Sequence, residues 1–100
     1  MSAPNAGITK TSTQMSGGPY ANGQVKVTAN NAGYATQWYA YMGPPPPVPI
    51  WHDTNYIATC APGSWMVMLK ANTAVTWNPA VPTPVTVAAG YQNVLAVTYT

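Results

Sequence analysis

The sequence predicts a single all-β domain folded as an antiparallel sandwich, and three observations carry that prediction. Apolar and polar residues alternate with a period of two in several short segments, which is typical of strands that bury one face. Turn-forming residues separate these segments, and no segment repeats apolar residues at helical spacing over a useful length. About six or seven short strands within 100 residues are typical of one two-layer sandwich.

The first predicted strands lie in the first half of the chain. Residues 24–29 alternate apolar and polar side chains, and residues 37–42 do the same with Trp38 on the apolar face. Asn and Gly at residues 30–33 predict a turn between them. The proline run at residues 43–49 cannot donate ladder hydrogen bonds, so it predicts a stiff, extended connection.

The remaining strands are predicted in the second half. Residues 56–60 favour a short strand, and the Pro-Gly pair that follows favours a tight turn. Prolines between residues 79 and 84 confine that stretch to a loop or a sheet edge. Residues 85–99 predict two strands around a turn. The strand at residues 65–70 has two faces, one with Trp65, Val67 and Leu69 and the other with Met66, Met68 and Lys70.

The N-terminal segment, residues 1–22, differs from the rest of the chain in its composition and residue pattern. It is small and polar, and it shows no apolar period. We therefore expect a flexible or extended arm at residues 1–22 and the sandwich at residues 23–100. Two alternatives remain open for the arm, a disordered tail without a role or a segment that orders against a neighbouring subunit.

Several short motifs follow one another between residues 23 and 100. They are G-x-V-x-V-T at residues 23–28, Gln37-Trp38, Trp51, Ala-Pro-Gly-Ser at residues 61–64 before Trp65-Met66-Val67, Thr76-Trp77-Asn78-Pro79, Val85-Thr86-Val87-Ala88-Ala89-Gly90 and Val97-Thr98-Tyr99-Thr100. This order resembles small immunoglobulin-like β-sandwich modules of the PEGA and carboxypeptidase-regulatory type, which recur in bacterial surface proteins. The resemblance implies an immunoglobulin-like antiparallel sandwich, here in one copy, with tryptophans and tyrosines in its core and no catalytic residues.

Charged side chains are scarce. The sequence holds three lysines, one aspartate and no arginine or glutamate, so only 4% of its residues are charged. Nucleic acids and anionic membranes are bound largely through rows of basic residues, and we expect neither as a partner. No signal peptide or membrane-spanning apolar run is visible, and a single cysteine cannot form an internal disulfide.

His52, Asp53 and Cys60 are the only side chains that suggest catalysis. A cysteine with a histidine and an acid can act as a nucleophile. Neighbouring residues of an extended segment point to opposite faces, however, so His52 and Asp53 are not expected to share a hydrogen bond. The resemblance places a buried apolar residue at Cys60, and free cysteine is among the residue types most often buried. We therefore predict that Cys60 is a buried structural thiol, that the protein is not an enzyme, and that it holds no cofactor. Metal sites need three or four ligands, so no metal site is expected within one chain.

The candidate interface residues are aromatic, thioether and basic side chains that the strand pattern leaves outside the core. Exposed Trp and Tyr can anchor a protein interface or stack on sugar rings. Thioethers on an outward sheet face suggest that another surface covers them. The predicted contact residues are Lys10, Trp51, Met66, Met68 and Tyr91.

These features favour a structural protein of an assembly. We expect a virion component, either a capsid decoration (cement) protein or a tail-associated protein, that docks on capsid or tail subunits and forms homo-oligomers. The alternative is a cell-surface or extracellular adhesion module that binds carbohydrate through its aromatic residues. The resemblance favours the alternative, whereas the missing export signal favours the first hypothesis.

Overall fold

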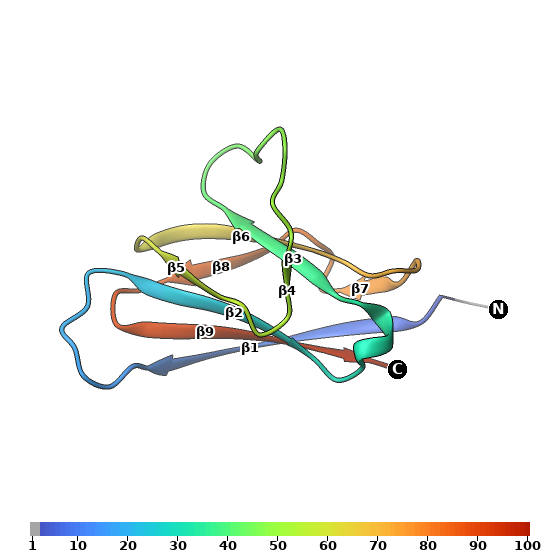
Figure 1. Ribbon diagram of the computed structural model, residues 1–100, viewed down its shortest axis with the longest axis horizontal. Coiled ribbons are helices and arrows are strands. Elements are labelled where there is room, and N and C mark those ends of the chain that lie inside the picture. The colour runs from blue at the N-terminus through green and yellow to red at the C-terminus, as the bar shows by residue number, and fades with distance from the viewer. Residues whose placement is uncertain (1–2) are drawn as a thin grey trace.

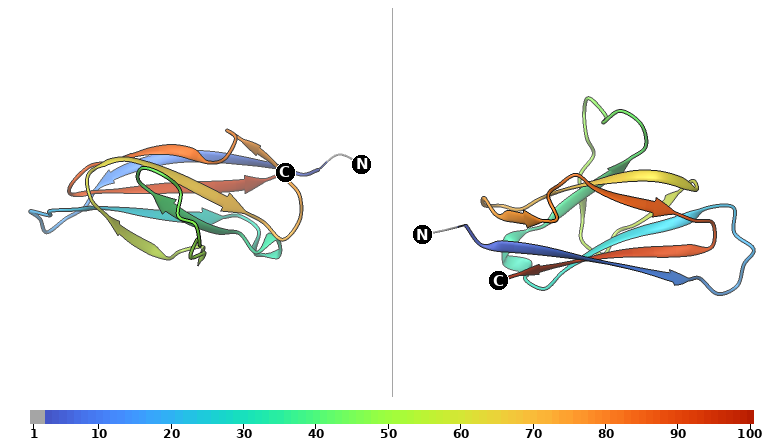
Figure 2. Two further views of the ribbon diagram at one scale, coloured as in Figure 1. Left: turned by 90° about the horizontal axis from the view of Figure 1, so that it is seen from above. Right: turned by 180° about the vertical axis from the view of Figure 1, so that it is seen from behind.

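The computed structural model describes residues 3–100, and in these residues the chain forms a two-layer β-sandwich (Figures 1 and 2). The all-β sandwich predicted from the sequence is confirmed. The described residues form nine strands and one short 3₁₀-helix. The strands are β1 (Asn5–Gln14), β2 (Gly23–Ala29), β3 (Gln37–Tyr41), β4 (His52–Asp53), β5 (Ile57–Cys60), β6 (Gly63–Lys70), β7 (Thr76–Asn78), β8 (Thr83–Val87) and β9 (Tyr91–Tyr99), and the helix is η1 (Ala32–Tyr34).

The strands divide into two sheets. Sheet A has the order β5-β2-β9-β1-β7 and sheet B the order β4-β3-β6-β8. Sheet B is antiparallel throughout, but sheet A contains two parallel pairs, β1 with β7 and β2 with β9. The expected antiparallel sandwich therefore needs correction in sheet A. Its parallel pairs join strands that are distant in sequence, which local alternation cannot reveal.

The core lies between the sheets and follows the predicted alternation. Trp38 is fully buried in β3, and Val67 and Leu69 point inward from β6. Trp65 and Trp77 are partly buried and pack against this core. The buried apolar residues are Ala6, Val25, Val27, Trp38, Cys60, Val67, Leu69, Val85, Val87, Leu95, Val97 and Tyr99.

The structure corrects the expected N-terminal arm. Residues 5–14 form β1, which pairs with β9 from Ala6 opposite Tyr99 to Gln14 opposite Tyr91. Only Ala6 of this strand is buried, and the residues from Thr9 onward are exposed, so backbone hydrogen bonds hold it in the sheet. This explains why its side chains show no apolar period. Met1 and Ser2 lie outside the described residues.

The proline-rich connection between β3 and β4 projects from the body of the sandwich (Figure 1). It spans residues 42–51 and carries the run of four prolines that begins at Pro44. Proline fixes the backbone φ angle and lacks an N–H, so this loop forms no ladder bonds. Its backbone bends at residues 42–44 and 47–48, so the extended connection expected from the sequence is instead a bent loop (Figure 1).

Candidate binding surface

The outer face of sheet B carries a cluster of aromatic and thioether side chains. Cross-strand register places Tyr39 opposite Met68 and Tyr41 opposite Met66. All four side chains are only partly buried, because the core lies on the other face of the sheet. We name this cluster the aromatic face and define it by the residues Tyr39, Tyr41, Trp51, Met66, Met68 and Lys70.

Trp51 joins the aromatic face from the end of the projecting loop. Its ring meets Tyr39 edge to face, with the ring centroids 4.7 Å apart. Tyr39 in turn lies 5.8 Å from Tyr41, measured between centroids. The Lys70 ammonium lies 4.2 Å from the centroid of the Trp51 ring, a cation–π contact. These contacts fix the orientation of the large side chains, so less side-chain entropy is lost when a partner covers them.

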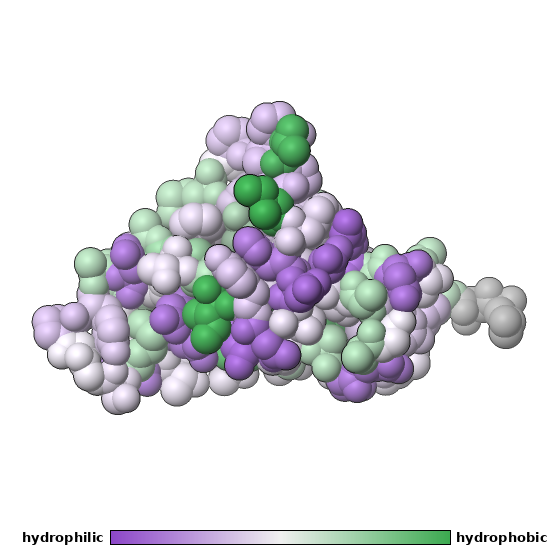
Figure 3. Space-filling model, in the orientation of Figure 1, coloured by the Kyte–Doolittle hydropathy of each residue, from purple (hydrophilic) through white to green (hydrophobic). Residues whose placement is uncertain are grey.

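The loop adds aliphatic surface next to this cluster. Val48 is 80% exposed and Ile50 is 74% exposed, the highest exposed fractions among the large apolar residues of the described chain. Figure 3 shows strongly hydrophobic surface on the projecting loop, above a more polar area. Tyr39, Pro46 and His52 help these two residues to line a cleft of about 210 Å³ at the base of the loop.

A cleft of about 320 Å³ lies at the other end of the aromatic face, and four polar side chains form part of its lining. Its lining includes Gln37, Asp53, Lys70 and Asn72. The Gln37 side-chain amide donates a hydrogen bond of 3.1 Å to the Asp53 carboxylate. Gln37 lies opposite Asp53 on one side and opposite Lys70 on the other, so a carboxylate, an amide and an ammonium follow one another across three strands.

His52, Asp53 and Cys60 do not form a catalytic group. His52 lies beside Trp38 and stacks on Tyr56 with the ring centroids 3.9 Å apart, whereas Asp53 lies beside Gln37. The two neighbours thus point to opposite faces of sheet B, as strand alternation predicts. Cys60 is buried on the inner face of β5, in the other sheet, and burial raises the pKa of its thiol. A raised pKa lowers the thiolate fraction and with it the nucleophilicity of the sulfur.

The structure places Lys10 away from the aromatic face. Lys10 lies opposite Leu95 on the core-facing side of β1, and its ammonium donates a 3.1 Å hydrogen bond to the Pro84 carbonyl of β8. The Asn93 amide of β9 donates in the same way to the Thr86 carbonyl, at 3.3 Å. Both contacts join sheet A to the outer edge of sheet B. Lys10 therefore has an inter-sheet contact that the sequence pattern did not reveal.

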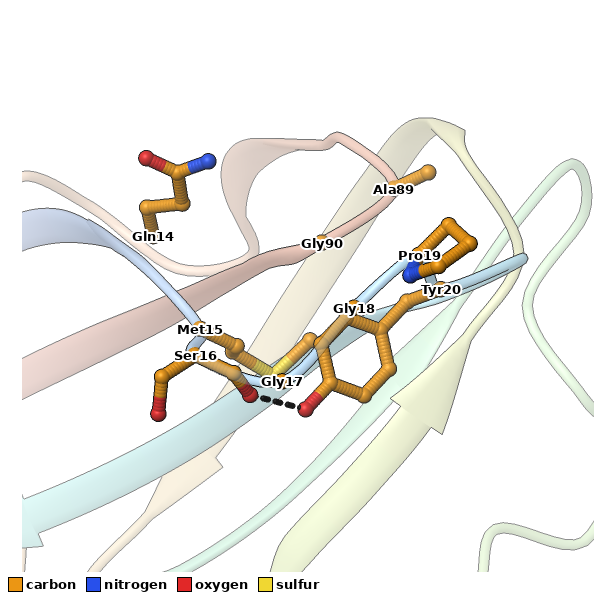
Figure 4. Close-up of a pocket in the computed structure, with 9 residues that line it drawn as sticks. All are labelled: Gln14, Met15, Ser16, Gly17, Gly18, Pro19, Tyr20, Ala89 and Gly90. Carbon is orange, nitrogen blue, oxygen red and sulfur yellow. Dashed lines mark hydrogen bonds between the residues drawn. The ribbon is translucent and has the colours of Figure 1, made fainter.

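Tyr91 lies at a different end of the molecule, at the start of β9 and 38% exposed. A concavity of about 650 Å³ is formed nearby by the end of β1, the loop that follows it and the β8–β9 turn. Figure 4 shows that only uncharged residues line it and that the Tyr20 hydroxyl closes the loop on the Ser16 carbonyl. The lining offers little chemistry for specific recognition.

The structure thus brings together Trp51, Met66 and Met68 among the five predicted contact residues. Tyr39 and Tyr41 were not among those five, and the register of β3 against β6 adds them to the same surface. Tyr39 and Tyr41 alternate with the apolar face of their predicted strand, just as Met66 and Met68 alternate with the apolar face of theirs. That shared alternation was the sequence signal that could have included them.

Other classes of site have few candidates in the described part of the chain. Within residues 3–100, no group of three or more His, Cys, Asp or Glu side chains is close enough to hold a metal ion. No helix in that range is long and apolar enough to cross a membrane. Comparisons with protein-family models, with curated proteins and with solved structures find no match for this chain.

Proposed function

We propose that the protein is a non-enzymatic structural component of a larger assembly, of the kind that decorates a virion capsid or tail. In this proposal the aromatic face binds a protein subunit of the assembly. The observation that carries the proposal is the continuous outward cluster of Trp51, two tyrosines and two methionines beside a projecting apolar loop.

The composition of this surface favours a protein partner. Tyr, Trp and Met are enriched at the cores of protein interfaces, whereas Lys and Asp are depleted there. The aromatic face has one charged side chain, Lys70, and its ammonium already contacts the Trp51 ring. Lys70 is exposed, so its ammonium can stay in water at the rim of the interface while a partner covers Trp51 and Tyr39.

The loop between β3 and β4 supports the same proposal. Val48 and Ile50 are exposed on a projecting loop whose backbone is restricted by the four prolines at residues 44–47. Rigid apolar side chains that project from a surface can enter a groove of a partner at little entropic expense. Together the loop and the aromatic face offer two adjoining contact areas on one side of the molecule.

Replacing Trp51 with alanine tests this proposal. A buried interface Trp typically contributes about 2 kcal/mol or more to binding, so we expect the affinity for the assembly to fall roughly thirty-fold or more. The measurement is the fraction of tagged protein that sediments with large particles in a lysate of source cells. Thr28→Ala, on the outer face of sheet A, is the matched control and should sediment like the wild type.

The Trp51→Ala variant should also stay folded, with an unfolding free energy within about 1 kcal/mol of the wild type, because the side chain lies outside the core. Equal sedimentation of Trp51→Ala and wild type would contradict the proposal. So would a wild-type protein that remains entirely in the slowly sedimenting fraction.

A second candidate function is carbohydrate binding, and the cleft that shares Lys70 with the aromatic face favours it. Asp53, Gln37 and Asn72 can accept and donate hydrogen bonds to hydroxyl groups, while the Trp51 ring can stack on a sugar. The same sedimentation experiment separates the two candidates. Release of the protein by a mixture of neutral oligosaccharides favours the carbohydrate, and retention in their presence favours the protein subunit.

A further inference from the structure

One edge of sheet A is open along most of β1. On one side β1 pairs with β9 through nine register positions, from Ala6 to Gln14. On the other side β7 pairs only with Asn5, Ala6 and Gly7. Within residues 3–100, no strand pairs with this edge along residues 8–14, and Figure 1 shows β1 along the margin of the molecule over this stretch.

The register shows which backbone groups point away from the sheet. Asn5 and Thr100 exchange two hydrogen bonds of 3.1 and 2.9 Å, and the Met15 amide donates to the Gly90 carbonyl at 2.7 Å. In an antiparallel pair such hydrogen-bonded positions alternate with positions whose N–H and C=O point outward. Odd-numbered residues of β1 therefore bond to β9. The outward positions of the open stretch are Ile8, Lys10, Ser12 and Gln14.

The other sheet edges are short or blocked. β8 carries Pro84, which has no N–H, and side chains of Lys10 and Asn93 already occupy the carbonyls of Pro84 and Thr86. β4 has only two residues and β5 only four. Natural edge strands are commonly protected by proline, by outward charge or by shortness. β1 is a ten-residue strand without proline, and its one charged side chain is turned toward β8.

We infer that this edge is a self-association site, where β1 of a second copy pairs antiparallel with β1 about a two-fold axis. One antiparallel register between two copies of β1 is more favourable than the registers shifted by two residues in either direction. Antiparallel pairing requires outward positions to face outward positions. Placing Ile8 opposite Gln14 of the second copy uses all four outward positions of each strand, with about eight hydrogen bonds.

Charge selects the same register. With Ile8 opposite Gln14, Lys10 lies opposite Ser12 of the second copy, so the two lysines do not face each other. A shift by two residues in one direction would place Lys10 directly opposite Lys10, which is unfavourable. A shift in the other direction would leave Ile8 without a partner. In this register the single charged residue of each strand, Lys10, lies opposite an uncharged residue of the second copy.

The outer face of the paired strands is complementary too. In this register Thr11 lies on the two-fold axis opposite Thr11 of the second copy, and Thr9 lies opposite Thr13. Cross-strand threonine pairs stabilise antiparallel sheets. These are positions without backbone hydrogen bonds between the copies, where Cα atoms approach to about 4.5 Å.

A disulfide at Thr11 tests this arrangement. The expected Cα separation falls within the range that a disulfide spans, so Thr11→Cys should form covalent dimers under a glutathione redox buffer. The wild type is the first control, because its only cysteine, Cys60, is buried. Thr28→Cys, on the outer face of β2, is the second control and should stay monomeric under the same conditions. Crosslinking of Thr11→Cys no faster than Thr28→Cys would overturn the inference.

Ser12 provides a test without a covalent bond. Ser12→Pro removes an outward N–H and leaves the bonds to β9 intact, so the chain should fold while the dimer dissociation constant rises about tenfold or more. Ser12→Ala keeps the N–H and should dimerise like the wild type in sedimentation equilibrium. A wild type that stays monomeric at millimolar concentration would overturn the inference. Exchange protection of the Ser12 amide only in the presence of the native particle would assign the edge to a strand of another protein and would overturn it as well.

Discussion

Replacing Trp38 with alanine is expected to destabilise the protein by about 3–5 kcal/mol, the range for deleting a buried aromatic side chain. Trp38 has no exposed surface, and it is among the largest side chains buried between the sheets. Its indole N–H also donates a 3.2 Å hydrogen bond to the Asp53 carbonyl, which would lose its partner. Since small domains are stable by only about 5–15 kcal/mol, the variant should unfold far below the wild-type urea midpoint.

Trp51→Ala is the matched control for this prediction. It removes the same side chain from the outer face of the same sheet, where it makes an edge contact with Tyr39 and no core contact. Its unfolding free energy should change by about 1 kcal/mol or less. Similar unfolding midpoints for Trp38→Ala and Trp51→Ala would contradict the assignment of Trp38 to the core and Trp51 to the aromatic face.

Gly23→Ala is the second substitution with a large expected effect, a loss of about 3 kcal/mol. A methyl group added at Gly23 would lie 2.5 Å from the Ala88 carbonyl oxygen and 2.6 Å from Val87 Cγ1. The backbone oxygen cannot move without opening the turn between β8 and β9. Urea unfolding followed by tryptophan fluorescence measures the loss.

Gly7→Ala is the control for Gly23→Ala. Gly7 also lies in a strand of sheet A, but the nearest atom to an added methyl group is the Thr98 carbonyl oxygen at 3.8 Å, an ordinary contact. Alanine restricts the unfolded chain more than glycine does, so Gly7→Ala should be neutral or slightly stabilising. Equal destabilisation by the two substitutions would show that the crowding at Gly23 is not the cause.

The strands that bury one face could be predicted from the sequence. Val25 and Val27 in β2, and Val67 and Leu69 in β6, are buried and alternate with residues that are less buried, as the sequence predicts. β1 could not be predicted in this way. From Thr9 onward its side chains are exposed on both faces, and its place in the sheet depends on the backbone of β9, more than seventy-five residues away in the chain.

The candidate site was predictable in part, for the same reason. Alternation along β6 placed Met66 and Met68 outside, and the stiff proline run suggested that Trp51 was accessible. Tyr39 and Tyr41 join this surface because β3 pairs with β6. Alternation within each strand does not reveal which strands pair. The sequence predicts Lys10 as a contact residue of an N-terminal arm. In the folded chain its strand is part of sheet A, and its ammonium bonds to the Pro84 carbonyl.

Photo-crosslinking from the aromatic face tests the proposed docking function most directly. A photoreactive residue at Tyr41, next to Tyr39 on that face, should crosslink in source cells to one protein subunit of a large particle. The same residue at Thr28, on the outer face of sheet A, should give little of that product. Absence of a product from Tyr41, or the same product in equal yield from Thr28, would contradict binding through the aromatic face.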